Sequence, residues 1–359
     1  MKLFKSLLVA PATLGLLAPM SASANEVTIN DFNAAEEIAV TNSRVDGLEA
    51  RFNDLEAGSF SETTTASFGV DFLVGAVDGA SNETVTFDYQ MGIGLETSFT
   101  GEDALSATID IGNASSQVGG TDGLNFDGTS DALKLDGLTY TFPLGGATVM
   151  VGDNTDISAV YTGACAYSSF TDYMGNCGTG NSVGIGGKGV TAAASYAFDS
   201  GFSLAGGISA TQIDDNDVVT GLLTKEGTDI YGIEAAYTAD SWGVSVGYAD
   251  DETKTYWGIN GTYAFDALSI SAGVESEDSG SATAEGFFVG LSFPEVGAGS
   301  LDIGMGTTGN FKDSDPEYYI YEASYSYPIN DGMTITPGIY LREGSTDLTG
   351  VAVKTSFSF

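Results

Sequence analysis

From about residue 66 to residue 359, the chain alternates apolar residues with small or polar ones at a period of two. Successive side chains of a β-strand point to opposite faces, so this period predicts strands that each have one apolar face. The candidate strands are 67–76, 84–99, 104–112, 131–142, 146–152, 189–199, 201–211, 229–239, 241–249, 255–265, 267–275, 284–293, 299–308, 317–327, 332–342 and 348–359. The alternation therefore predicts an all-β chain of sixteen strands.

The links between these strands alternate in length. The short links are 100–101, 143–145, 200, 240, 266, 294–298 and 328–331, and the longest are 113–130, 153–188 and 212–228. An up-and-down membrane barrel has this pattern, with tight turns on one side of the membrane and longer loops on the other. We therefore predict a 16-stranded antiparallel transmembrane β-barrel over residues 66–359.

One strand changes phase. Leu133 and Leu135 have one parity, whereas Leu138 and Tyr140 have the other. A bulge adds one residue to a strand and so returns the following side chains to the same face. The sequence predicts such a bulge at Gly137.

Ten charged residues within the strands have the parity opposite to the apolar set. A basic residue that faces lipid at mid-membrane costs about 2–4 kcal/mol, so this parity is expected to face inward. Most other inward positions are small, and a barrel of this size is wide enough to enclose an aqueous channel. The predicted pore-lining residues are Asp71, Asp88, Asp110, Lys134, Glu234, Glu275, Asp302, Glu322, Arg342 and Lys354.

The longest loop, 153–188, contains both cysteines, Cys165 and Cys177. Secretion through an oxidising compartment favours a disulfide between them, which would stabilise the loop by about 3 kcal/mol; two free thiols are the alternative. We hypothesise that the loop folds into the barrel and narrows it, with Asp153, Asp156 and Asp172 influencing ion preference. An external lid is the competing interpretation.

Charge and composition exclude several functions. The net charge of −38 makes a nucleic-acid partner improbable. It favours cations in any pore, although solubility of the loops explains the charge equally well. The chain has no His, which removes Ser-His-Asp and Cys-His catalysis and every His-liganded metal site. We predict no catalytic residues, no metal and no cofactor.

The N-terminal part differs from the rest. Residues 1–24 have a basic start, an apolar stretch and an Ala-Ser-Ala end, the features of a secretory signal peptide. Residues 25–65 are predicted to be a periplasmic helix and linker. The helix has a short heptad seam, which could form a coiled coil or lie at the barrel mouth. The seam residues are Ile38, Val45, Leu48, Phe52 and Leu55.

The segment Ser43-Arg-Val-Asp-Gly-Leu-Glu-Ala-Arg-Phe-Asn-Asp-Leu-Glu56, followed by Phe60-Ser-Glu-Thr-Thr-Thr65, resembles a known junction. It is similar to the coiled-coil-to-barrel junction of cyanobacterial outer-membrane porins, called iron-uptake or carbohydrate-selective, OprB-like porins. The resemblance implies an integral protein of a bacterial outer membrane, in contact with its lipid, that forms a homotrimer. The S-layer-homology domain that such porins carry is expected to be absent.

These features together favour passive diffusion of small hydrophilic solutes or inorganic ions through a cation-preferring pore. Lys134, Arg342 and Lys354 leave a second interpretation of the pore open, in which a basic cluster faces the acidic loops across the channel. The alternative function is a surface or structural protein for which the barrel is only an anchor.

Overall fold

A computed structural model describes residues 64–80, 83–114, 124, 126, 128–184, 189–211, 214–215, 218–219, 221–225 and 227–359. The predicted signal peptide lies outside the described residues. So do the periplasmic helix, its seam and the linker as far as residue 63.

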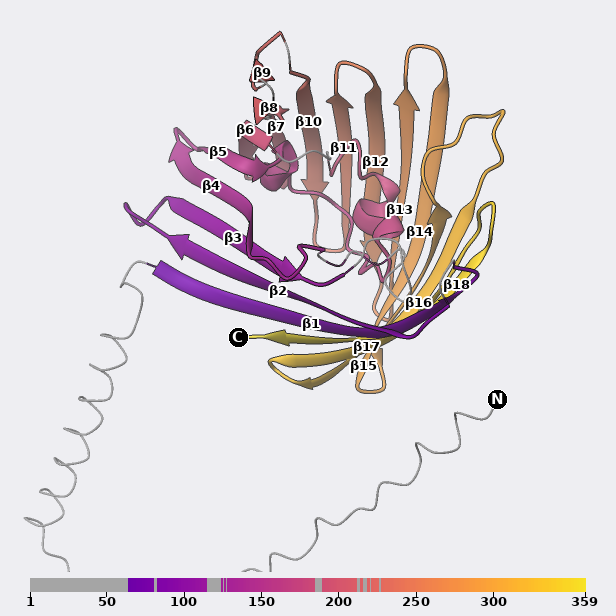
Figure 1. Cartoon of the computed structure of the whole chain (residues 1–359). Coiled ribbons are helices and arrows are strands. Elements are labelled where there is room, and N and C mark those ends of the chain that lie inside the picture. The colour runs from indigo at the N-terminus through magenta and orange to yellow at the C-terminus, as the bar shows by residue number, and fades with distance from the viewer. Residues whose placement is uncertain are drawn as a thin grey trace, which may run out of the picture. The chain divides into compact units, whose positions relative to one another are not determined.

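Sixteen antiparallel strands form a closed barrel, shown in Figure 1. Each strand pairs with its neighbours along the chain, and β18 pairs with β1. The strands are β1 (Thr64–Asp78), β2 (Thr86–Thr97), β3 (Ala104–Gly112), β4 (Lys134–Leu144), β5 (Ala147–Thr155), β6 (Gly189–Ala197), β7 (Phe202–Ala210), β10 (Asp229–Thr238), β11 (Trp242–Asp250), β12 (Thr255–Ala264), β13 (Ser269–Asp278), β14 (Thr283–Val296), β15 (Gly299–Thr307), β16 (Tyr319–Asn330), β17 (Met333–Arg342) and β18 (Leu348–Ser358). The predicted all-β, 16-stranded antiparallel barrel is confirmed.

Two further short strands, β8 (Asp214–Asp215) and β9 (Val218–Val219), pair with each other in the loop after β7. Among the described residues, no helix combines the length and the apolar character that crossing a bilayer requires.

The first and last strands close the barrel. Their register runs from Gly69 opposite Ser358 to Asp78 opposite Thr349. The pairing continues beyond β18, because Phe68 and Phe359 exchange two backbone hydrogen bonds of 2.9 and 3.1 Å. Closure gives each of the sixteen barrel strands a paired neighbour on both sides.

β4 has a bulge next to the predicted position, with Asp136 and not Gly137 as the residue that has no partner in β3. Thr108 of β3 pairs with Gly137, but Ile109 pairs with Leu135, so the register shifts by one residue between them. As a result, Leu135 and Leu138 are both exposed although their parities differ. The extra residue keeps the apolar side chains of β4 on the outer face.

The two faces of the wall differ as the alternation predicts. The exposed large side chains are mostly apolar and lie on one parity, as with Val351 and Val353 of β18. Aromatic rings contact each other in pairs at the tight-turn ends: Tyr140 stacks on Phe142, and Tyr263 lies tilted against Phe265. The opposite parity faces inward and carries small, polar and charged residues.

Inward glycines of the barrel wall differ in how much space an added side chain would find. A Cβ on Gly350 of β18 would lie 2.0 Å from the ring of Tyr340, which is only 1% exposed. A Cβ on Gly69 of β1, also inward, would meet no described atom within 4 Å. Replacing Gly350 by Ala should therefore destabilise the barrel by about 1–3 kcal/mol through overpacking.

Gly69→Ala is the matched control, since it makes the same change in the paired strand. Urea unfolding of the reconstituted barrel measures both variants, and the outward-facing Trp242 and Trp257 serve as fluorescent reporters. Equal midpoints for the two variants would contradict tight packing at Gly350.

Candidate functional site

The chain between β5 and β6 folds into the barrel. We call residues 156–184 the inner loop. It contains two short 3-10 helices, η3 (Ile157–Val160) and η4 (Asp172–Gly178). η3 contacts β5, β6 and β7, and η4 contacts β12 to β15. In Figure 1 this pink segment crosses the space that the strands enclose. Its position is therefore internal, and the external-lid interpretation does not hold.

Glu322 of β16 makes one of the main contacts between wall and loop. Its Oε1 accepts hydrogen bonds from the Tyr167 hydroxyl at 2.9 Å and from the Phe170 amide at 2.8 Å. Its Oε2 accepts from the amide and hydroxyl of Thr171 at 2.8 and 2.6 Å. The side chain is 3% exposed. A carboxylate is an acceptor only, so four converging donors suit it well.

Burial, together with the nearby charge of Glu322, raises the pKa of the Tyr167 hydroxyl. A tyrosine hydroxyl is protonated at neutral pH in any case, and the raised pKa extends to more alkaline pH the range over which Tyr167 donates its hydrogen bond to Glu322.

Two more inward glutamates contact the inner loop in the same way. Glu275 of β13 accepts from the Asn181 and Ser182 amides at 3.0 and 2.8 Å, and also from both of their side chains. Glu234 of β10 accepts from the Thr162 and Gly163 amides at 2.8 and 2.9 Å. Both glutamates are buried. The three wall glutamates stand three strands apart and hold both ends and the middle of the loop.

Glycines on the inward face make room for the loop. A Cβ on Gly338 of β17 would lie 2.4 Å from the Phe170 ring, and one on Gly304 of β15 would lie 2.6 Å from the Tyr167 hydroxyl. A Cβ added to Gly247, Gly258, Gly273 or Gly290 would lie 2.1–2.5 Å from other atoms of the inner loop. Only residues without a side chain allow so close a contact with the wall.

The inner loop is also linked to itself and to β17. A disulfide joins Cys165 and Cys177, and Cys177 is completely buried. Arg342 of β17 donates a hydrogen bond to the Tyr173 hydroxyl and lies 5.7 Å from the centre of its ring. These contacts hold the segment from 165 to 177 as one compact unit against the wall.

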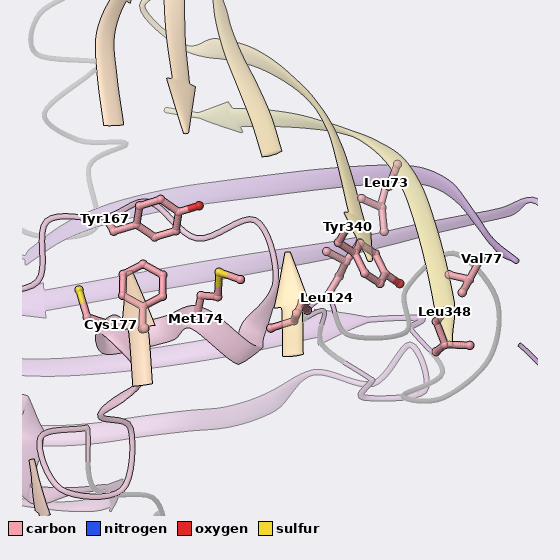
Figure 2. Packing of buried hydrophobic residues seen from close by; sticks show 11 residues of the cluster. Leu73, Val77, Leu124, Tyr167, Met174, Cys177, Tyr340 and Leu348 are labelled. Carbon is pink, nitrogen blue, oxygen red and sulfur yellow. The ribbon is translucent and has the colours of Figure 1, made fainter. Parts of the chain in front are cut away.

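Apolar packing supports the polar contacts. Figure 2 shows Tyr167, Met174 and Cys177 of the inner loop on one side of a buried cluster. Leu73, Tyr340 and other wall residues lie on the other side of the cluster. A second buried cluster holds the start of the loop, where Ile157 packs on Met150 and Ala193. The loop therefore has its own core within the barrel.

The inner loop leaves one side of the wall open. Between the loop and strands β18, β1 and β2 lies a cavity of about 190 Å³. Lys354, Gln90 and Leu73 line it from the wall, and Ser169 to Asp172 line it from the inner loop. Leu124 and Phe126, from the chain between β3 and β4, also line it. Gln90 donates to Asp71 at 2.8 Å within the wall.

The structure corrects part of the predicted pore lining. Asp88, Glu234, Glu275, Asp302 and Glu322 face inward, but each is at most 8% exposed. The expectation that they border water is wrong, because the wall glutamates are occupied by the loop and Asp302 accepts from Ser292 at 2.5 Å. The side chains of Asp71, Asp110, Lys134, Arg342 and Lys354 remain partly or fully exposed.

The predicted loop acids also differ in position. Asp153 lies within β5 opposite Leu138, on the parity of the exposed apolar residues, so it does not belong to the loop. Asp156 caps η3 and accepts from the Ser158 amide at 2.9 Å. Asp172 begins η4, and its side chain is exposed in the cavity beside β18.

Sequence reasoning missed the donors of the inner loop. Thr171, Asn181 and Ser182 are ordinary polar loop residues in the sequence, and nothing in their spacing indicates a partner. The available signal was the presence of glutamates inside strands, since a buried carboxylate needs hydrogen-bond donors.

The architecture is that of a 16-stranded porin-type barrel with an internal loop. OprB of Pseudomonas putida has a similar fold, with a TM-score of 0.64 and 12% identity over 83% of this chain and 94% of that one. An anion-selective porin from Comamonas acidovorans is also similar, with a TM-score of 0.59 and 14% identity over 83% of this chain and 99% of that one. A variant of OmpT, an outer membrane protein of Vibrio cholerae, has a TM-score of 0.60 and 11% identity over 83% of this chain and 100% of that one.

Sequence comparison adds less. No profile of a known protein family matches the chain. An uncharacterized protein of Nostoc sp. (strain PCC 7120) is 34% identical over 167 residues, which are 40% of this chain and 27% of the Nostoc protein. The match therefore spans about a quarter of that relative. A porin-type fold is established, and the expected cyanobacterial OprB-like family stays a prediction.

Replacing Glu322 by Gln should release the middle of the inner loop. Gln has one acceptor oxygen and turns an NH₂ toward donors, so at least two of the four hydrogen bonds are lost. Each hydrogen bond to a charged group contributes about 1.5–3 kcal/mol. We expect amide hydrogen exchange at Phe170 and Thr171 to rise at least about tenfold, measured on the folded barrel by mass spectrometry.

Asp302→Asn is the matched control, because it neutralises a buried inward carboxylate of the neighbouring strand that bonds Ser292 on the wall. Exchange at Phe170 and Thr171 should not change in this variant. A similar rise in both variants would mean that Glu322 has no specific role in holding the loop.

Proposed function

We propose that the chain is an outer-membrane porin that lets small hydrophilic solutes and ions diffuse passively, with the inner loop as its constriction. The observation that carries this proposal is the contact of the inner loop with the three wall glutamates. A loop held at three places inside the barrel narrows the passage without closing it. The fold shared with other porins supports the same function.

The apolar outer face favours a position within a membrane. Its exposed side chains include Ile233, Trp257 and Val351, at 54%, 52% and 53% exposure. Such a surface is unfavourable in water and favourable in lipid. Paired aromatic rings at the tight-turn ends suit the membrane interface. Outer-membrane lipid is thus the proposed surrounding, and the homotrimer remains a proposal from the sequence.

The charges support a preference for cations. Exposed carboxylates crowd the long-loop end of the barrel, where exposed basic residues are few. The carboxylates are those of Glu252, Asp278, Asp313, Asp315, Glu317 and Asp347. Lys254 at that end is already paired with Glu277 at 2.6 Å. The resulting negative field raises the local concentration of cations at the mouth.

Deleting residues 158–182 tests the constriction. Removing the loop opens the space against β10 to β17, so single-channel conductance in planar bilayers should rise. The variant's barrel must first be shown to fold, by its β-sheet circular dichroism and resistance to protease. Unchanged conductance in a folded variant would refute the constriction.

A salt gradient across a planar bilayer tests the ion preference. The reversal potential should have the sign of a cation-selective channel. The preference should be larger near 0.01 M salt, where the Debye length is about 30 Å, than near 1 M, where it is about 3 Å. Replacing Asp313, Asp315 and Glu317 by their amides should reduce it. An anion-selective reversal potential would refute cation preference, and absence of any conductance would favour a barrel that serves only as an anchor.

A further inference from the structure

The cavity between the inner loop and strands β18, β1 and β2 presents two opposite charges that do not pair with each other. Lys354 of β18 lines it from the wall, and Asp172 of η4 lines it from the loop. No ion pair joins them within 4.0 Å, and neither side chain has a hydrogen-bond partner among the described residues. Each charged group therefore faces the cavity without a direct hydrogen bond or ion pair to the described residues that line it.

We propose that this cavity is a solute-binding subsite for a small zwitterion, such as an α-amino acid with a short side chain. The proposal rests on the proposed porin function, because a solute reaches the cavity through the lumen. The carboxylate of the zwitterion lies toward Lys354 and its ammonium group toward Asp172. A singly charged ion satisfies one of the two groups, and a neutral sugar satisfies neither.

The acidic side of the subsite is held in place by the inner loop. Asp172 follows Thr171, whose amide and hydroxyl both donate to Glu322 of β16. The neighbouring Phe170 amide donates to the same carboxylate. A charge fixed by its backbone loses little freedom when a solute binds, which favours affinity.

The basic side is set by the register of the barrel. Lys354 pairs with Leu73 of β1 and Thr336 of β17, in a pleat whose side chains face inward. Leu73 and the Phe170 ring add apolar surface at the edge of the same cavity. At about 190 Å³, the cavity holds a solute of only a few non-hydrogen atoms. Its size and mainly polar lining favour the smallest amino acids.

Entry of radiolabelled L-alanine into liposomes that contain the full chain tests the proposal. The initial rate should saturate with concentration, as binding at a subsite requires. Propionate lacks the ammonium group of alanine, and ethylammonium lacks its carboxylate. Each should compete with alanine at least about tenfold more weakly than glycine does, because one charge contact of about 1.4 kcal/mol is missing.

Two variants remove the charges one at a time. Lys354→Met and Asp172→Asn should each raise the half-saturating alanine concentration about tenfold while ion conductance persists. The exchanged pair, Lys354→Asp with Asp172→Lys, should restore affinity at least in part, since a zwitterion can bind in reverse. Lys134→Met is the matched control: Lys134 shares the inward parity, lies on β4 and does not line the cavity, so its loss should not affect half-saturation.

The possible failures are distinguishable. One such result is that liposomes with the wild-type chain conduct ions while alanine entry stays linear with concentration; that result overturns the subsite and leaves the porin function standing. The same conclusion follows if the Lys354 and Asp172 variants behave like Lys134→Met. If the wild-type chain conducts no ions, the proposed function fails, and the subsite fails with it.

Discussion

Hydrogen bonds from the backbone of the inner loop to glutamates of the barrel wall are the interaction on which the interior depends. A segment without regular structure carries amide groups that need partners, and inside a barrel only water or the wall can supply them. A buried carboxylate has the complementary need, since an unpaired charge away from water is costly. Glu234, Glu275 and Glu322 meet both needs at once. Neither the loop nor the glutamates would be stable there alone.

The wall is built differently on its two sides. On β11 to β17, inward glycines such as Gly273 and Gly338 lie under loop atoms with no space for a side chain. On β1, a Cβ added to Gly69 would meet no described atom within 4 Å. Asp71 of β1, Gln90 of β2 and Lys354 of β18 are partly exposed. Small inward residues thus have two roles, because some admit the loop and others leave space for water. The open side of the wall is where we place the passage of solutes.

The similar structures show how little of the sequence the barrel itself requires. Identities of 11–14% accompany a shared fold, because alternation, tight turns and closure can be met by many residues. The same freedom means that selectivity does not follow from the fold. An anion-selective porin is among these structures, whereas we propose a preference for cations in this chain from its exposed carboxylates. Selectivity depends on side chains at the loop, the mouth and the open wall.

The sequence by itself determined the strands, their antiparallel order, a bulge beside Gly137 and the inward parity of the ten charged strand residues that it singled out. These follow from local rules, since side-chain direction alternates along a strand and turn length limits which strands are neighbours. Only the tertiary structure decided which inward charges meet water. The contacts that bury Glu234, Glu275 and Glu322 join residues 72, 93 and 151 positions apart, and Asp153 proved to be part of β5. Those outcomes depend on the path of the inner loop, which is set by packing and hydrogen bonds across the barrel and not by any local pattern.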